Sequence, residues 1–201
     1  MDKLAFAQEP KRYGILQRLR ALAGDRRGVG AVEFALIAPL LLGLYITAFE
    51  ITMGLSVGKR VTRSANTISD LVTQQTSVSP NFLLTMTNVA KSMFAPYSAK
   101  DITLKITGVT IDAAGKPTVL WSWGYWNSAA QDAPYKIGDP FNVPSEMRVA
   151  SSFLVHSEVS VSHELLMFMP GIMPQSVREI TIRREYFYHQ RLGDNIPCAL
   201  C

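Results

Sequence analysis

The N-terminal third of the chain carries its longest run of apolar positions. Residues 34–49 read FALIAPLLLGLYITAF without a charge, and after Glu50 a weakly apolar stretch continues to Gly58. A helix needs about 20 apolar residues to cross the hydrocarbon core of a bilayer. Residues 29–58 are long enough, provided that Glu33 and Glu50 are accommodated. The pattern therefore predicts a membrane-spanning helix near the N-terminus.

The charge that precedes this stretch favours a membrane anchor over two alternatives. Residues 1–28 hold seven Lys or Arg and three Asp or Glu, a net charge of +4. A buried core helix does not explain such a basic flank. A cleaved secretory signal would have a shorter apolar region and a small-residue cleavage site after it. Because the basic side of a membrane helix stays in the cytoplasm, we expect residues from about 59 onward to lie in the periplasm.

Beyond the apolar run, the periodicity indicates two helices. One apolar stripe has members three or four positions apart: Val57, Val61, Ala65, Ile68 and Val72. It predicts that the membrane helix continues as an amphipathic helix to residue 75. Ser79 and Pro80 have the residue types of a helix cap and a first helical position, so a second helix is expected from there to Pro96. Its apolar positions are Phe82, Met86, Val89 and Met93.

From Asp101 onward the alternation changes to a period of two, which is typical of strands. The expected strands are residues 102–111, 118–126, 151–162 and 176–189. The first two form a hairpin, in which Gly108 interrupts the alternation as a bulge would, and residues 127–147 are expected to be a loop. The predicted fold class is α+β, with a long N-terminal transmembrane helix, a second helix and an antiparallel sheet of about four strands. The chain thus divides into a basic cytoplasmic leader at 1–28, a helical part at 29–75 and a periplasmic α+β domain at 76–201.

A sequence signal marks the junction between the leader and the apolar helix. It reads RRGVGAVEF from Arg26 to Phe34, with a glycine five residues before a glutamate. This arrangement resembles the class III signal of type IV prepilins, which prepilin peptidase cuts after the glycine. The resemblance implies cleavage between Gly28 and Val29, which would make Glu33 the fifth residue of the mature chain.

Two roles are open for Glu33. In pilins this glutamate pairs with the amino terminus of a neighbouring subunit and sets the register between subunits, which would offset the cost of burying both charges. Alternatively, the carboxylate only interacts with the helix dipole. Farther along, Pro39 removes one backbone donor and is a candidate helix kink, which membrane helices tolerate.

A longer segment narrows the resemblance. Residues 26–70 resemble the N-terminal module of the TadE/TadG-like family, the minor pilins or pseudopilins of the tight-adherence (Tad/Flp) pilus system. The shared features include the arginine before Gly28, the residues around Glu33, Pro39 and Glu50. The chain is most similar to a TadE or TadF type, because TadG-like proteins often carry a large extra domain. The resemblance implies a pilin-like fold, with the long helix packed across a small sheet.

The family resemblance also implies partners and a location. The partners are other minor pilins, the major Flp pilin, prepilin peptidase, the inner-membrane assembly platform and the lipid bilayer. The location is the bacterial inner membrane, crossed once, and incorporation into the pilus is left open. The predicted function is that of a minor pilin in the assembly of a Tad (Flp) type IV pilus for adhesion. The alternative is an uncleaved, membrane-anchored periplasmic binding module, with glycans as candidate ligands of its tryptophans.

Residue types that carry catalysis form no recognisable pattern. His156, His163 and His189 lack the spacing of zinc ligands, and the sequence contains neither a glycine-rich phosphate loop nor a G-x-S-x-G nucleophile motif. We therefore expect no enzyme activity, no cofactor and no metal. We also expect no nucleic acid as a partner, because the excess positive charge lies in residues 1–28 rather than in a basic patch on the folded domain.

Two groups of apolar residues are candidate partner surfaces. They are Trp121, Trp123 and Tyr125 in one expected strand, and Met167, Met169 and Met173 in the segment 165–174. The aromatic residues share one strand face, where they either pack in the core or contact a ligand or partner. Flexible methionines suit adaptable protein contacts, and a loop folded over the core explains them equally well.

The two cysteines of the chain, Cys198 and Cys201, lie at its C-terminal end. Disulfides persist in the periplasm, and the C-x-x-C spacing permits a bond when the residues form a turn. A redox motif would lie in a βαβ unit, which the sequence does not predict. We expect a structural disulfide within the chain or between subunits.

Overall fold

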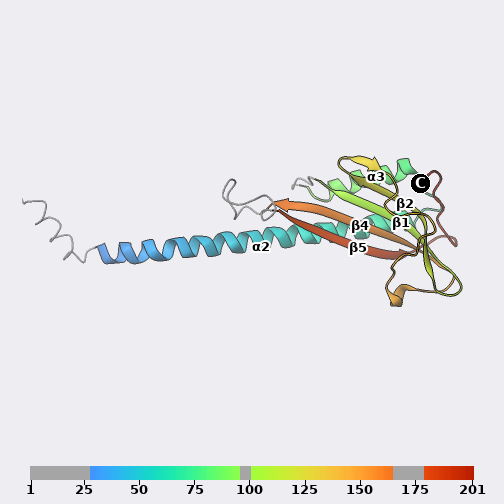
Figure 1. Cartoon of the computed structure of the whole chain (residues 1–201). Helices are drawn as coiled ribbons and strands as arrows, with labels where there is room; N and C mark the ends of the chain where they lie inside the picture. The colour runs from blue at the N-terminus through green and yellow to red at the C-terminus, as the bar shows by residue number, and fades with distance from the viewer. Residues whose placement is uncertain (1–27, 96–100, 165–178) are drawn as a thin grey trace, which may run out of the picture. The chain divides into compact units, whose positions relative to one another are not determined.

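The computed structural model describes residues 28–95, 101–164 and 179–201 of the chain (Figure 1). The helices in these ranges are α2 (Val29–Thr73), α3 (Pro80–Ser92) and the short 3₁₀ helix η2 (Ser145–Met147). The strands are β1 (Thr103–Ile111), β2 (Pro117–Trp126), β3 (Ala129–Gln131), β4 (Ser152–Glu164) and β5 (Glu179–His189). They form one antiparallel sheet with the order β3-β2-β1-β4-β5. The α+β prediction is confirmed.

The sheet has one strand more than the sequence predicts. β3 pairs with the last three residues of β2 and lies in the region 127–147, which we expected to be a loop. Three residues are too few for an alternation to be visible in a sequence. The predicted start of the last strand, residues 176–178, lies outside the described residues.

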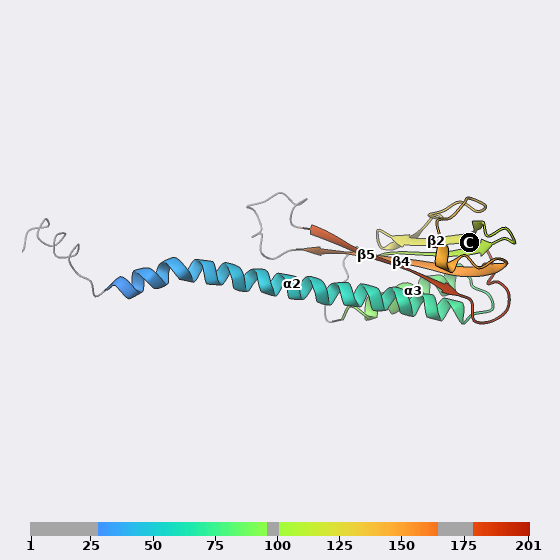
Figure 2. The ribbon, with the colours of Figure 1, turned by 90° about the horizontal axis from the view of Figure 1, so that it is seen from below.

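The second half of α2 packs against one face of the sheet, and α3 covers the same face (Figure 2). The predicted apolar stripe is confirmed, since all of its members are buried: Val57, Val61, Ala65, Ile68 and Val72. They join the core that the inward-facing residues of the sheet form, such as Leu104, Ile106 and Val159. Burying an aliphatic side chain contributes about 1.5–3 kcal/mol. The stripe is therefore the main attachment of α2 to the sheet.

Two buried hydroxyl groups add polar bonds to this packing. Ser157 Oγ on β4 donates to the carbonyl oxygen of Ala65 at 3.0 Å and lies 2.5 Å from Ser69 Oγ. A buried polar group without a partner costs about 1–3 kcal/mol. The two bonds avoid this cost and link α2 to β4 inside the core.

The start of α3 is as predicted. Ser79 Oγ accepts a hydrogen bond from the backbone N–H of Phe82 at 3.3 Å, and Pro80 is the first helical residue. The buried side differs in part from the predicted one: Leu83 and Ala90 are buried, whereas Phe82 is only half-buried. These positions form adjacent apolar rows on the helix, and the spacing alone does not decide which of them faces the sheet.

The β1–β2 hairpin contains the predicted bulge. The pairing register shifts between Gly108 and Val109. The side chains of Trp121 and Phe153 occupy the space into which a Cβ at position 108 would project. Glycine is therefore required here by the close approach of two core aromatic rings.

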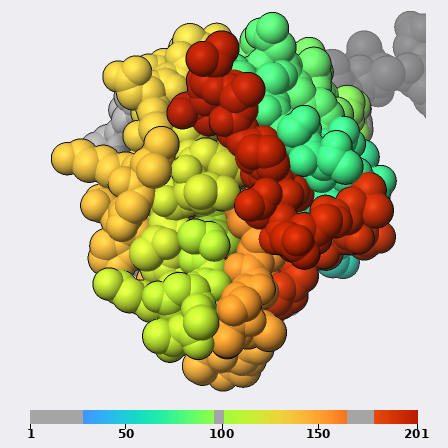
Figure 3. Space-filling model, turned by 90° about the vertical axis from the view of Figure 1, so that its right-hand side faces the viewer, coloured from blue at the N-terminus to red at the C-terminus, as the bar shows by residue number. Residues whose placement is uncertain are grey.

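The C-terminal segment closes one end of the domain. Trp121 Nε1 donates to the carbonyl oxygen of Ile196 at 2.6 Å, and Val78 exchanges backbone hydrogen bonds with Pro197 and Ala199. Figure 3 shows this segment, in red, crossing the end of the domain beside the helical residues in green. The buried tryptophan thus ties the C-terminus to the core.

Candidate functional site

The first half of α2 exposes most of its large apolar side chains. Between residues 29 and 55 all of them except Ile46 and Met53 are 45–74% exposed, with Leu40 at the upper end. Soluble monomers rarely expose contiguous apolar patches of this extent, which mark membrane or protein contacts. Among the described residues, α2 is the one helix that is long and apolar enough to cross a membrane. It is consistent with a membrane anchor.

The predicted processing signal lies at the start of this helix. Gly28 directly precedes Val29, the first residue of α2. Glu33 is the fifth helical residue; it is exposed and has no partner among the described residues. The dipole effect falls off within the first turn, so it gives this carboxylate little stabilisation. Glu33 therefore remains available to a group outside the described residues. Farther on, α2 continues through Pro39.

The outer face of the sheet, opposite the helices, holds a charged cluster. Glu158 on β4 is 2% exposed. Its carboxylate accepts from Lys105 Nζ at 3.1 Å and from Arg183 Nη2 at 2.8 Å, and the hydroxyl of Tyr135 lies 3.4 Å away. In the register of the sheet, Glu158 stands directly opposite both Lys105 and Glu185. The two cations neutralise one carboxylate that would otherwise be buried and unpaired.

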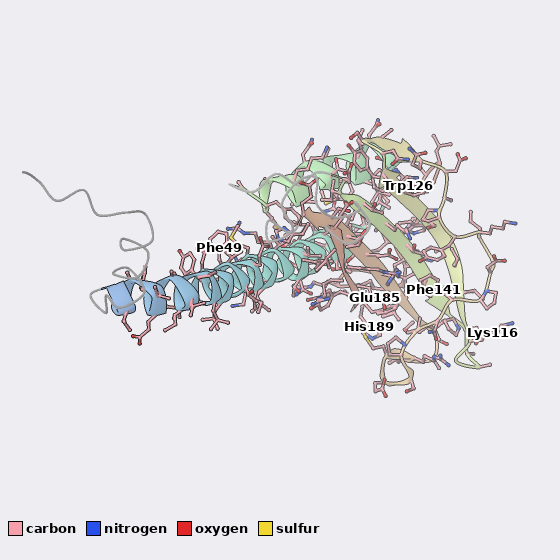
Figure 4. The ribbon with its side chains drawn as sticks, turned by 60° about the vertical axis from the view of Figure 1, so that its left-hand side comes forward. Phe49, Lys116, Trp126, Phe141, Glu185 and His189 are labelled. Carbon is pink, nitrogen blue, oxygen red and sulfur yellow. A yellow bond between two sulfur atoms is a disulfide. The ribbon has the colours of Figure 1, made fainter. Side chains whose placement is uncertain are left out.

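An aromatic group covers His156 beside this cluster. Phe141 comes from the loop between β3 and β4, Phe187 comes from β5, and their ring centres lie 5.0 and 4.6 Å from the imidazole. Figure 4 labels Phe141 and Glu185 near this part of the sheet. Burial lowers the pKa of His156 below its ordinary value, and the nearby Glu185 carboxylate opposes this only in part. The imidazole is therefore held neutral, as an aromatic packing element.

The loop also supplies a half-buried phenol, that of Tyr135. Burial raises the pKa of Tyr135, and the charge of Glu158 adds to the increase. The hydroxyl therefore stays protonated and can donate to the carboxylate. Within the described ranges, no group of three or more His, Cys, Asp or Glu side chains is arranged to hold a metal ion.

Residues 28–68 match the family model described as TadE-like protein. This segment is TadE-like. The match begins at Gly28, the glycine of the predicted processing signal, and ends at Ile68, within the buried stripe of α2. This match supports an association of the protein with a Tad pilus system. No curated protein and no solved structure matched the chain.

Outside the TadE-like segment, the structure places the aromatic candidates in the core. Trp121, Trp123 and Tyr125 are 2–5% exposed. They belong to the core that the helices cover, which favours the core-packing interpretation of these residues. The methionine candidates, Met167, Met169 and Met173, lie outside the described residues.

The cysteine candidates are joined. Cys198 and Cys201 form a disulfide, with their Cα atoms 5.6 Å apart. Cys198 lies next to Val78, with which it forms an isolated β-bridge. The disulfide therefore closes the segment that ties the C-terminus to the start of α3.

Sequence reasoning did not identify the charged cluster as a site. Alternation along residues 151–162 places His156 and Glu158 on the strand face opposite Phe153, but it gives no indication that this face is buried. The burial depends on the path of the loop from 132 to 147, which has no periodicity. The available signal was the presence of oppositely charged residues, such as Lys105 and Glu158, on different strands. The signal becomes informative only when the strand order shows that these strands are neighbours.

Proposed function

We propose that the protein is a non-catalytic minor pilin that takes part in assembly of a Tad (Flp) type IV pilus for adhesion. The observation that carries the proposal is a TadE-like segment whose exposed apolar helix begins at Val29, directly after the glycine of a prepilin signal. In this proposal α2 crosses the bacterial inner membrane, the leader is cytoplasmic and the α+β domain is periplasmic. Prepilin peptidase removes the leader after Gly28.

Leader removal would create the partner that Glu33 lacks. It releases the free amino group of Val29, which titrates at about 7.7–8.0 and is largely cationic at pH 7. A carboxylate at the edge of the hydrocarbon core is costly unless it is paired. Pairing of Glu33 with the amino terminus of a neighbouring pilin would compensate both charges and set the axial register. The partners are the other minor pilins and the major Flp pilin, brought together at the inner-membrane assembly platform.

The test is intact-mass and N-terminal analysis of the chain extracted from membranes of cells that make a Tad pilus. The wild-type chain is expected to start at Val29. Gly28→Val should leave the leader attached, whereas the control Gly30→Val should not, because a Cβ meets no other atom within 4 Å at either position. A full-length wild-type chain, or normal cleavage of the Gly28 variant, would refute the processing step.

A second readout tests the role of Glu33. Glu33→Gln keeps the size of the side chain and removes its charge, so leader cleavage is expected to persist while recovery with other pilins falls. Glu33→Asp, which keeps the charge, should restore part of that recovery. Equal recovery for all three chains would leave the helix dipole as the better account of Glu33.

The alternative of an uncleaved glycan-binding module has less support. Its candidate ligand contacts, Trp121 and Trp123, are buried, so a sugar could not stack on their ring faces without opening the core. A full-length chain whose tryptophan fluorescence changes on adding sugars would favour this alternative.

A further inference from the structure

A groove of about 1140 Å³ runs between α2 and the edge of the sheet. Its helical side extends from Thr47 to Thr67, and its other side is formed mainly by β5 from Ile180 to Arg184. β5 is the edge strand of the sheet, so the groove opens at the flank of the domain. Among the described residues, nothing fills it.

The two ends of the groove differ in chemistry. At the end nearer the start of α2 it is lined by Ile51, Leu55 and Ile180, which are 48–63% exposed. Farther along α2 it is lined by Lys59 and Arg63, which lie one turn apart on the helix and face the same side. The groove thus passes from an apolar end to a cationic end.

The cationic end has more positive charge than the domain neutralises. Lys59, Arg63 and Arg184 are exposed, and none of them forms an ion pair with the described carboxylates. Arg184 Nη1 donates a hydrogen bond to the backbone carbonyl of Arg183 at 2.8 Å. Three cations without a counter-charge in one groove are complementary to an anionic group.

The position of the groove along α2 places it at the surface of a bilayer. If the hydrocarbon core begins at Phe34, directly after Glu33, about 20 residues carry the helix through it, to Met53. Lys59 then lies six residues farther, about 9 Å of helix rise beyond the core. Helical side chains lean toward the N-terminus of the helix, here toward the membrane, and long cationic side chains extend back to the interface. The apolar end of the groove therefore lies at the level of the acyl chains and the cationic end at the level of the headgroups.

We infer that this groove binds an anionic phospholipid of the leaflet that faces the folded domain. The upper part of an acyl chain lies along Leu55 and Ile180, and Lys59, Arg63 and Arg184 hold the phosphate, for which the planar arginine fork is suited. The inference rests on the membrane anchoring proposed above. In this inference a lipid, rather than the helix of another pilin, occupies the groove between α2 and β5.

The one carboxylate on the helical side of the groove is compatible with this orientation. Glu50 is 6% exposed and lies at the apolar end, nine residues before Lys59, which corresponds to about 14 Å of helix rise. An acidic side chain at that end offers no positive charge to a phosphate. The headgroup is thereby directed to the cationic end.

The first test counts the lipids that stay bound. The full-length chain is reconstituted into vesicles of phosphatidylcholine and phosphatidylglycerol, extracted in mild detergent and analysed by native mass spectrometry. Lys59→Gln/Arg63→Gln is expected to retain several-fold less phosphatidylglycerol than wild type. The control Lys116→Gln/Lys136→Gln removes the same charge from two exposed lysines outside the groove and should retain the wild-type amount. Equal retention in both variants, or an equal loss, would overturn the inference.

The second test identifies the occupant directly. The photo-crosslinking amino acid benzoylphenylalanine is placed at position 55 instead of leucine, and the vesicles are irradiated. A mass increase of one phospholipid supports the inference, whereas crosslinking to a second chain would show that a pilin occupies the groove and would overturn it.

Flotation of the same vesicles separates this inference from the proposed anchoring. A chain that floats with the vesicles but shows no difference between the two double variants refutes the lipid site alone. A chain that does not float refutes the membrane anchor, and the lipid site with it.

Discussion

The buried carboxylate of Glu158 provides the sharpest test of how the outer face of the sheet is held together. The perturbation is Glu158→Gln, which keeps the size of the side chain and removes its charge. The matched control is Glu185→Gln, because Glu185 stands directly opposite Glu158 on the next strand and also contacts Arg183, at 3.4 Å. The two side chains differ in exposure, which is 3% for Glu158 and 53% for Glu185, and Glu185 also lies 3.4 Å from His156 Nε2.

The magnitude follows from which charges are left behind. Removing one partner of a fully buried ion pair costs about 3–5 kcal/mol, because the other charge stays buried. Here Lys105 and Arg183 are 26% and 54% exposed, so both can regain water and the cost is reduced. The amide of glutamine also retains one acceptor oxygen. We therefore expect Glu158→Gln to lower the free energy of unfolding by about 2–3 kcal/mol.

The control should behave differently. Exposed ion pairs contribute about 0–1 kcal/mol, and Glu185→Gln also removes a like charge directly opposite Glu158, which is favourable. We expect a change within about 0.5 kcal/mol. Urea unfolding of the full-length chain in detergent micelles, followed by the fluorescence of Trp121 and Trp123, measures both values. Equal effects of the two substitutions would refute the reasoning, since burial would then not determine the cost.

Two further substitutions test the aromatic cover and the bulge. Burial lowers the pKa of His156, so the unfolded chain binds more protons than the folded chain as the pH falls below about 6.5. The free energy of unfolding should therefore decrease below this pH and be level above it. In urea titrations at a series of pH values, His156→Phe should abolish this dependence, whereas His189→Asn should preserve it. Gly108→Ala should destabilise by about 1–3 kcal/mol through contact with Trp121 and Phe153. The control is Gly58→Ala, which lies in a helix where the new Cβ meets nothing within 4 Å. It should be neutral or stabilising by up to about 1 kcal/mol. Equal shifts in the melting temperatures of the two alanine variants would contradict this expectation.

The long helix α2 could be predicted from the sequence in detail. Its first half is apolar on all sides, and its second half has one apolar stripe, so the two environments leave different patterns in one helix. The stripe from Val57 to Val72 is buried as predicted. The change from one pattern to the other occurs close to Lys59, where the first unpaired cation of the groove lies.

The outer face of the sheet could not be predicted in the same way. Alternation assigns a residue to a face, and it does not say whether that face is covered. Glu158 has the residue type of a solvated strand position, yet it is buried because Tyr135 and Phe141 fold over the sheet from a loop. The row formed by Lys105, Glu158 and Glu185 needs the order β1-β4-β5, which depends on long-range pairing that no local pattern records.

The TadE-like segment accounts for only one side of the interface between helix and sheet. It ends at Ile68, so it contains the predicted processing signal, the apolar helix and most of the buried stripe, but no strand. The other side is formed by residues such as Leu104 and Val159, with Ser157 adding buried polar bonds to α2. The matched segment therefore contains the apolar part of α2 and the helical side of the contact between α2 and the sheet. The sheet must carry the rest.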